Sequence, residues 1–192
     1  MPINNSVPDR AYESDDRVQP DSRPYITAYV DRLKESGVLN EPAVEQAFRR
    51  VPRHLFVERF FVGDEEKGWT PGEHDPTRPT AEHLEMIYSG AALITRLEGN
   101  LPTSSTSQPG LVADMLQLLE LRPGMRVLEI GAGTGYNAAL MAELVGDPGL
   151  VVTIDIQEDV VEDARRSRTR AGYPGIRVLC QDGCEGAPEA AP

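Results

Sequence analysis

Three glycines at alternate positions follow a short apolar run in the second half of the chain. The segment reads Val-Leu-Glu-Ile-Gly-Ala-Gly-Thr-Gly-Tyr-Asn and contains Gly131, Gly133 and Gly135. Glycines at a turn from a strand into a helix leave backbone N–H groups bare, so a ligand can lie against them at the positive helix end. Asp155 ends the next apolar run, where an acid is placed to bind the two hydroxyls of a ribose. The pattern therefore predicts a site for a cofactor that contains a nucleoside.

The spacing of the glycines distinguishes between two cofactor classes. An oxidoreductase that binds a dinucleotide normally has Gly-x-Gly-x-x-Gly, whereas this chain has Gly-x-Gly-x-Gly. Glu129 lies two residues before the first glycine, and its carboxylate suits an amino or sulfonium cation better than a diphosphate. We therefore favour S-adenosyl-L-methionine, with a dinucleotide as the alternative.

Asp182 follows the third apolar run of this region. Its carboxylate is a candidate acceptor for the exocyclic amino group of adenine. The alternative is an ordinary Asp-Gly turn with Gly183.

The elements that must position these residues follow from the hydrophobic pattern. Strands are predicted over 126–130, 150–155 and 176–180, and they alternate with helices over 137–145 and 158–171. This alternation is typical of a parallel α/β sheet with right-handed crossovers. Before it, the polar run ending in Ser107-Gln108-Pro109 predicts a helix that Ser107 caps.

The first half of the chain is less regular. Residues 1–21 are polar and are predicted to form a disordered tail. Helices are predicted over 23–36 and from an N-cap at Asn40 to near Arg50, then a long surface loop over 62–82 and a short strand or helix within 84–97. We accordingly divide the chain into the tail, an N-terminal helical and loop region over 22–100 that packs on the core, and a partial cofactor-binding α/β domain over 101–192.

Composition narrows the function classes. The net charge is −12, with 31 acidic and 19 basic residues, so a phosphate backbone would be repelled and nucleic acid is not an expected partner. No apolar run approaches the roughly 20 residues that span a bilayer, and we expect a cytoplasmic protein without a membrane partner. Two cysteines form no zinc pattern, and His74 and His83 match no ligand spacing, so no metal is expected.

Three segments together resemble protein-L-isoaspartate O-methyltransferases: Val-Pro-Arg-His-Leu-Phe-Val over 51–57, Thr-Ser-Gln-Pro over 106–109, and 127–136 with Gln-Asp-Gly over 181–183. The resemblance covers roughly 25–190, with 62–82 poorly matched. It implies a seven-stranded, Rossmann-like class I methyltransferase fold, S-adenosyl-L-methionine as cofactor, and a protein or peptide substrate bearing isoaspartate or aspartate. It also implies that Ser107 is the active-site serine and that the cofactor is bound by Glu129, Gly131, Gly133, Gly135, Asp155 and Asp182.

The chemistry of such a reaction is compatible with a serine at position 107. A substrate carboxylate has an unperturbed pKa of about 4, so it is ionised at neutral pH and needs no general base. Alignment of oxygen, methyl carbon and sulfur is what the protein must supply, and a hydroxyl could orient one oxygen. The alternative is that Ser107 only caps the helix.

Three functional alternatives remain open. The first is a repair enzyme for isoaspartyl residues, and the second is a peptide-tailoring aspartyl methyltransferase, because the Thr-Ser-Ser-Thr-Ser-Gln-Pro run is similar to actinobacterial relatives associated with ribosomal peptides. The third is an inactive cofactor-binding fragment. The chain ends at Pro192, where the family would enter its fourth strand, so we expect a truncated enzyme of weak or no activity. Its 126–130 strand would expose an edge through which the chain could self-associate.

Overall fold

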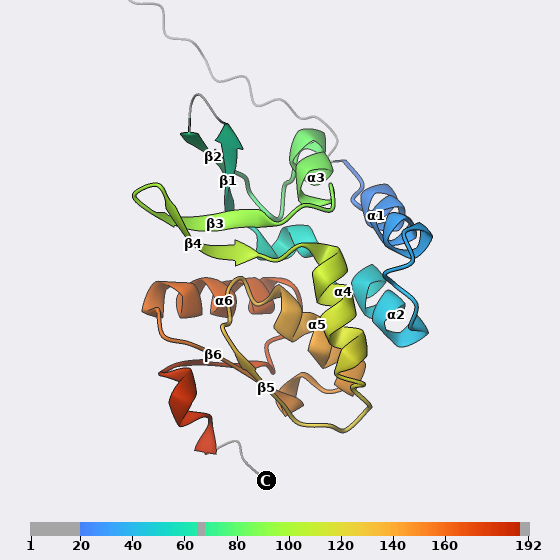
Figure 1. Ribbon diagram of the computed structural model, residues 1–192, viewed down its shortest axis with the longest axis vertical. Coiled ribbons are helices and arrows are strands. Elements are labelled where there is room, and N and C mark those ends of the chain that lie inside the picture. Colours follow the sequence, from blue (N-terminus) through green and yellow to red (C-terminus); the bar gives the residue numbers. More distant parts are fainter. Residues whose placement is uncertain (1–19, 65–67, 189–192) are drawn as a thin grey trace, which may run out of the picture.

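The computed structural model of the protein describes residues 20–64 and 68–188 (Figure 1). Residues 1–19 of the predicted tail lie outside the described residues. The first half of the chain supplies a four-stranded antiparallel sheet, and the second half supplies a three-stranded parallel sheet. The predicted mixed α/β class with preceding N-terminal helices is confirmed.

Two helices open the described part of the chain. Helix α1 (Arg23–Glu35) and helix α2 (Pro42–Arg50) match the predicted ranges. The N-cap position of α2 is Glu41, so the predicted cap at Asn40 is wrong. The side-chain amide of Asn40 instead donates to the carbonyl of Gly37 at 2.8 Å, which closes the turn after α1.

The antiparallel sheet occupies much of the segment that the sequence predicted to be a loop. After a 3-10 helix η1 (Arg53–Phe56), the chain forms strands β1 (Arg59–Asp64) and β2 (Gly68–Glu73) and helix α3 (Ala81–Ile87). Strands β3 (Leu93–Glu98) and β4 (Leu101–Thr106) follow, and the strand order is β2-β1-β3-β4. The hairpin of β3 and β4 pairs across residue 100, where we placed the boundary of the cofactor-binding domain.

The loop prediction for 62–82 holds for residues 74–80, which form no helix or strand, but it is wrong for β1 and β2. Long-range contacts stabilise β2. The indole of Trp69 donates to the carbonyl of Asn100 at 3.0 Å, on the turn between β3 and β4. Gly72 lies under the ring of Phe60 so closely that a Cβ there would come within 2.6 Å of the ring. A strand rich in Gly, Pro and Thr shows little periodicity, and neither contact is visible in the local sequence.

The second half of the chain has the predicted order of elements. Helix α4 (Pro109–Leu118) leads to strand β5 (Val127–Ile130), helix α5 (Tyr136–Val145), 3-10 helix η2 (Pro148–Leu150) and strand β6 (Val151–Asp155). Helix α6 (Glu158–Arg170), strand β7 (Arg177–Cys180) and 3-10 helix η3 (Gly183–Glu185) complete the described part. The strands are parallel in the order β5-β6-β7, as predicted.

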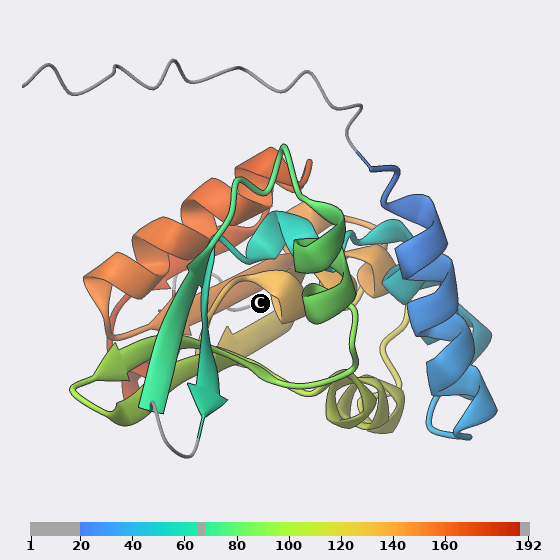
Figure 2. The ribbon, with the colours of Figure 1, turned by 90° about the horizontal axis from the view of Figure 1, so that it is seen from above.

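The elements are arranged in layers. Helices α5 and α6 lie on one face of the parallel sheet, and the antiparallel sheet lies on the other side of these helices (Figure 1). Viewed from above, α1 and α6 flank the molecule, with the β1–β2 hairpin and α3 between them (Figure 2). Buried apolar side chains from α1, α2, α5 and β7 belong to one continuous core, so the N-terminal elements pack directly on the α/β half.

Strand β5 has an open edge in this structure. Among the described residues it is hydrogen-bonded to β6 alone. Leu128 and Ile130, which point away from α5, are 45% and 66% exposed. The edge predicted to be exposed from the sequence is therefore observed in the described part of the chain.

Candidate active site

The glycine segment forms a tight turn between β5 and α5. Gly131, Gly133 and Gly135 have φ values of 96°, 50° and 82°, which L side chains rarely adopt. The N–H groups of Gly131 and Ala132 both donate to the carbonyl of Ile154, at 2.8 and 3.0 Å, and so fix the turn to β6. A Cβ on Gly131 would meet no heavy atom within 4 Å, so the space above this peptide is open to a ligand.

Asp155 lies at the end of β6 and contacts the glycine turn, as the sequence predicted. Its Oδ2 accepts a hydrogen bond from the N–H of Gly133 at 3.3 Å, and its Oδ1 accepts from the N–H of Gln157 at 3.2 Å. The carboxylate is thus held at the carboxyl edge of the sheet.

Glu129 points toward α5 and has two hydrogen-bond partners. Its carboxylate accepts from the side-chain amide of Asn137 at 2.8 Å and from the hydroxyl of Thr153 at 2.6 Å. Burial raises the pKa of the Glu129 carboxyl to about 7, against the opposing effect of these two hydrogen bonds. An adjacent cation would restore the ionised form, so this acid suits a cationic ligand.

Asn137 is a candidate site residue that the sequence reasoning missed. Its Oδ1 is buried and has no hydrogen-bond partner among the described residues. A buried acceptor without a donor is costly, so this oxygen is a place for an N–H group of a ligand. The signal that could have found it is its position in the first turn of α5, eight residues after Glu129 in the sequence.

Ser107 connects β4 to α4, but it is not the cap of α4. The N-cap is Gln108, whose side-chain oxygen accepts a hydrogen bond from the N–H of Leu111 at 2.7 Å. The prediction that Ser107 caps this helix is therefore wrong. Its hydroxyl has no hydrogen-bond partner among the described residues, and the residue is exposed.

A cavity of about 260 Å³ brings the serine and the glycine turn together. It lies between the β4–α4 connection and the start of α5. Its lining includes Ser105, Ser107, Glu129, Gly131, Thr134 and Asn137. The structure thus joins Ser107 to Glu129 and Gly131 in one cavity, which sequence spacing alone did not show.

Asp182 lies outside this cavity, at the end of β7. Its Oδ1 accepts a hydrogen bond from the N–H of Cys184 at 2.8 Å, so it forms the cap of η3. This backbone hydrogen bond lowers the pKa of the Asp182 carboxyl. The Asp-Gly turn that we considered as the alternative is thus formed, and the second carboxylate oxygen of Asp182 remains available to a ligand.

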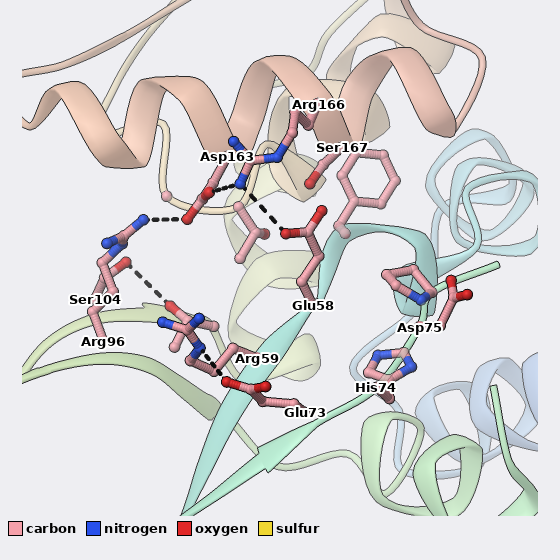
Figure 3. Close-up of a pocket in the computed structure, with 15 residues that line it drawn as sticks. Glu58, Arg59, Glu73, His74, Asp75, Arg96, Ser104, Asp163, Arg166 and Ser167 are labelled. Carbon is pink, nitrogen blue, oxygen red and sulfur yellow. Dashed lines mark hydrogen bonds and ion pairs between the residues drawn. The ribbon is translucent and has the colours of Figure 1, made fainter. Parts of the chain in front are cut away.

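A larger cavity of about 640 Å³ adjoins the glycine turn on the side of α6. Gly133 and Thr134 line it together with residues of β1, β2, β3 and α6 (Figure 3). Along its wall, Asp163 pairs with both Arg96 and Arg166, and Arg166 also approaches Glu58 at 3.4 Å. Sequence reasoning missed this cavity because its wall joins α6 and the glycine turn to the antiparallel sheet and to residues 73–76, which the local sequence does not bring together.

The histidines of the chain are packed rather than exposed. His54 is 6% exposed, its Nδ1 lies 2.8 Å from the hydroxyl of Tyr88, and burial lowers its pKa to about 4. The rings of His74 and His83 lie 5.0 Å apart.

In the described ranges no group of three or more His, Cys, Asp or Glu side chains is arranged to hold a metal ion. Nor does any helix in these ranges have the length and apolar character needed to span a membrane.

Comparison with known proteins places this geometry in a family. The family model described as "Protein-L-isoaspartate(D-aspartate) O-methyltransferase (PCMT)" matches residues 81–192. Proteins named protein-L-isoaspartate O-methyltransferase are similar in sequence: that of Methanococcoides burtonii is 49% identical over 160 residues, which cover 83% of this chain and 64% of the relative. That of Aeropyrum pernix is 36% identical over 176 residues, which cover 90% of this chain and 57% of the relative.

Two solved structures are similar to the chain in fold. A protein-L-isoaspartate O-methyltransferase has a TM-score of 0.67 at 32% identity, and the match covers 87% of this chain and 45% of that one. A second structure, from Plasmodium falciparum and titled as a complex with S-adenosyl-L-homocysteine, has a TM-score of 0.60 at 17% identity, covering 84% and 65%. The chain thus spans roughly half to two thirds of the length of these proteins. Because the family model covers more than half of the chain, the chain belongs to the protein-L-isoaspartate(D-aspartate) O-methyltransferase family.

Proposed function

We propose that this chain provides the cofactor-binding part of an S-adenosyl-L-methionine-dependent carboxyl O-methyltransferase that acts on L-isoaspartyl or aspartyl residues of proteins or peptides. The observation that carries the proposal is the cavity in which the unpaired hydroxyl of Ser107 adjoins the glycine turn and Glu129. Family membership supports the same reaction.

The residues at the cavity fit the proposed cofactor. The open space over Gly131 would accept the amino acid part, and Glu129 with the unpartnered Oδ1 of Asn137 would hold its ammonium group. Asp155 would bind the ribose, and Asp182 would bind the adenine, at the carboxyl edge of the sheet. When bound, the cofactor supplies a methyl group on a positively charged sulfur.

Ser107 would bind the acceptor carboxylate. Because Gln108 caps α4, the Ser107 hydroxyl is available to donate a hydrogen bond to one carboxylate oxygen and leave the other directed at the methyl group. The acceptor is ionised at neutral pH, so orientation and exclusion of water are the contributions required of the protein. No general base is needed in this step.

The product would be a methyl ester of the peptide. In a repair reaction the following backbone nitrogen then attacks the ester, methanol leaves, and a succinimide forms. In a tailoring reaction the same ester would form on an ordinary aspartate. The Thr-Ser-Ser-Thr-Ser-Gln-Pro run, which is similar to relatives associated with ribosomal peptides, spans the end of β4 and lines part of the cavity. An aspartyl peptide is therefore kept as the second candidate substrate.

The test supplies methyl-labelled cofactor and two peptides that differ only in an isoaspartyl or an aspartyl residue. Labelled ester on the isoaspartyl peptide alone indicates repair, and ester on the aspartyl peptide alone indicates tailoring. The relative from Methanococcoides burtonii serves as an active control. Calorimetric titration with S-adenosyl-L-homocysteine accompanies the assay. Binding without ester on either peptide would indicate a cofactor-binding fragment, and absence of both binding and ester would overturn the proposal.

A further inference from the structure

Arg53 is a buried cation next to the candidate active site. It is 0% exposed and begins η1. Its Nη2 donates to the carbonyls of Ala91 at 3.1 Å, Thr106 at 3.5 Å and Ser107 at 3.1 Å. Two of these carbonyls belong to the segment that carries the candidate acceptor-binding serine.

The guanidinium has no acidic partner among the described residues. Its Nε and Nη1 are buried and make no hydrogen bond of good geometry in that part of the chain, where the Tyr29 hydroxyl is a neutral neighbour. A buried charge without a counterion and with unpaired donors is unfavourable, and an apolar side chain of similar volume would normally cost less. Stability alone therefore gives a poor account of an arginine at this position.

The same guanidinium contacts the other wall of the cavity. Its Cζ lies 6.0 Å from the centre of the Tyr136 ring, within the range of a cation–π interaction. Tyr136 is the first residue of α5, directly after Gly135, and is 4% exposed. Both Tyr136 and Ser107 line the 260 Å³ cavity, so Arg53 joins the serine segment to the start of the helix that follows the glycine turn.

We propose that Arg53 is a positioning residue for methyl transfer: it sets the separation between the Ser107 hydroxyl and the glycine turn by bonding to the carbonyls of Thr106 and Ser107 while its guanidinium faces the Tyr136 ring. The proposal rests on the proposed function for its catalytic consequence, but its structural content is independent of turnover. The planar guanidinium suits this task because it can bond to carbonyls and face an aromatic ring together. A lysine ammonium at the same place would keep the charge and could donate to the carbonyls, but it would lose the planar face toward the Tyr136 ring.

The first test measures hydrogen exchange of the amides over 104–111 in Arg53→Met and Arg53→Lys. The matched control is Ile176→Ala, which removes a buried side chain next to β7, the strand at the opposite edge of the sheet from β5. Exchange is measured for each variant at the same interval below its own melting temperature. Over 104–111, both Arg53 variants should exchange faster than the control, and the rate in Arg53→Lys should lie between those of Arg53→Met and the control. Exchange no faster than in the control would overturn the proposal. If Arg53→Met does not fold, Arg53→Lys alone decides.

The second test uses turnover, measured well below the melting temperature of each variant. A displacement of about 1 Å between reacting groups costs about a hundredfold in rate, so kcat of Arg53→Met should fall by about that factor. The KM for cofactor should change much less, because the groups that would bind it remain in place. A fall in kcat no larger than that of Ile176→Ala would overturn the proposal. If the wild-type chain does not turn over, the exchange test alone decides the proposal about Arg53, and the titration with S-adenosyl-L-homocysteine decides between a cofactor-binding fragment and failure of the proposed function.

Discussion

Ser107 and Gln108 are neighbours with different tasks in this structure. Sequence reasoning assigned the helix cap to the serine because serine is a preferred cap residue. The structure gives the cap to Gln108, whose longer side chain reaches the N–H of Leu111. The Ser107 hydroxyl therefore does not cap the helix, and mutation can separate the capping role of Gln108 from the proposed acceptor-binding role of Ser107.

We predict that Ser107→Ala lowers kcat by about tenfold to a hundredfold, because an unoriented acceptor loses its alignment. The melting temperature should hardly change, since the hydroxyl has no partner among the described residues. The matched control is Gln108→Ala, which should cost about 1 kcal/mol of stability through loss of the cap. Steady-state kinetics and thermal unfolding of both variants check the prediction. An Ser107→Ala protein with normal kcat would contradict it.

Glu129 gives a prediction about pH. Burial raises its folded pKa to about 7, above the unfolded value near 4.5. The folded state therefore binds the proton more tightly, and the stability that this gives is complete below pH 4.5 and is lost as the pH rises through 7. Because Gln cannot ionise, we expect Glu129→Gln to have a larger free energy of unfolding than the wild type at pH 8. At pH 4.5 the free energies of unfolding of the two proteins should be closer.

Urea unfolding of both proteins between pH 4.5 and 8 measures this difference. The comparison must be between the two proteins, because buried His54, with its pKa lowered to about 4, changes the stability of both in the opposite direction over the same range. S-adenosyl-L-homocysteine should stabilise the wild type more than the variant at pH 8. A difference in stability that does not vary with pH would contradict the prediction.

At the scale of elements, the sequence was informative where structure is locally encoded. Positive-φ glycines such as Gly135 and Gly146 border α5. The alternation of apolar strands with amphipathic helices predicts β5, β6 and β7 with an error of one residue each. The antiparallel sheet was not predicted, because β2 depends on Trp69 reaching Asn100 and on Gly72 lying under Phe60. For the same reason the glycine turn and Asp155 were found from the sequence, whereas Asn137 and the two cavities required three-dimensional coordinates.

The connection between β3 and α6 gives the next prediction. Arg96 of β3 bonds to Asp159 and Asp163 of α6 and also donates to the carbonyl of Asp159 at 3.1 Å (Figure 3 shows its pair with Asp163). Partly exposed ion pairs contribute little individually and are screened by salt. We expect Arg96→Met to cost about 1 kcal/mol at low ionic strength and less at 1 M salt.

Denaturant unfolding at the two salt concentrations measures this effect, and hydrogen exchange locates it. Amides of β3 and β4 should lose protection in Arg96→Met, since the hairpin loses its bonds to α6. Arg59→Met is the matched control, because Arg59 of β1 pairs with Glu73 of β2 within the antiparallel sheet. Equal loss of protection of β3 and β4 in both variants would contradict the prediction.

For the whole molecule, the open edge of β5 has consequences for association. An unpaired strand edge offers backbone donors and acceptors to another chain. Leu128 and Ile130 of β5 are 45% and 66% exposed, which adds apolar surface beside this edge. The net charge of −12 opposes contact between copies. The balance between these terms depends on ionic strength, because salt screens the repulsion and leaves the apolar surface unchanged.

We therefore predict that the chain self-associates through β5, weakly at low salt and more strongly at 0.5 M salt. Sedimentation velocity over a range of protein concentrations measures the association. The double variant Leu128→Lys with Ile130→Lys should remain monomeric, since it places charges on the apolar flank of the edge. Leu101→Lys is the control, because Leu101 is 66% exposed, as Ile130 is, but lies on β4 of the antiparallel sheet. Equal effects of the double variant and the control would show that association uses another surface. A wild-type chain that is monomeric at 0.5 M salt would show that the exposed edge is insufficient to join two copies.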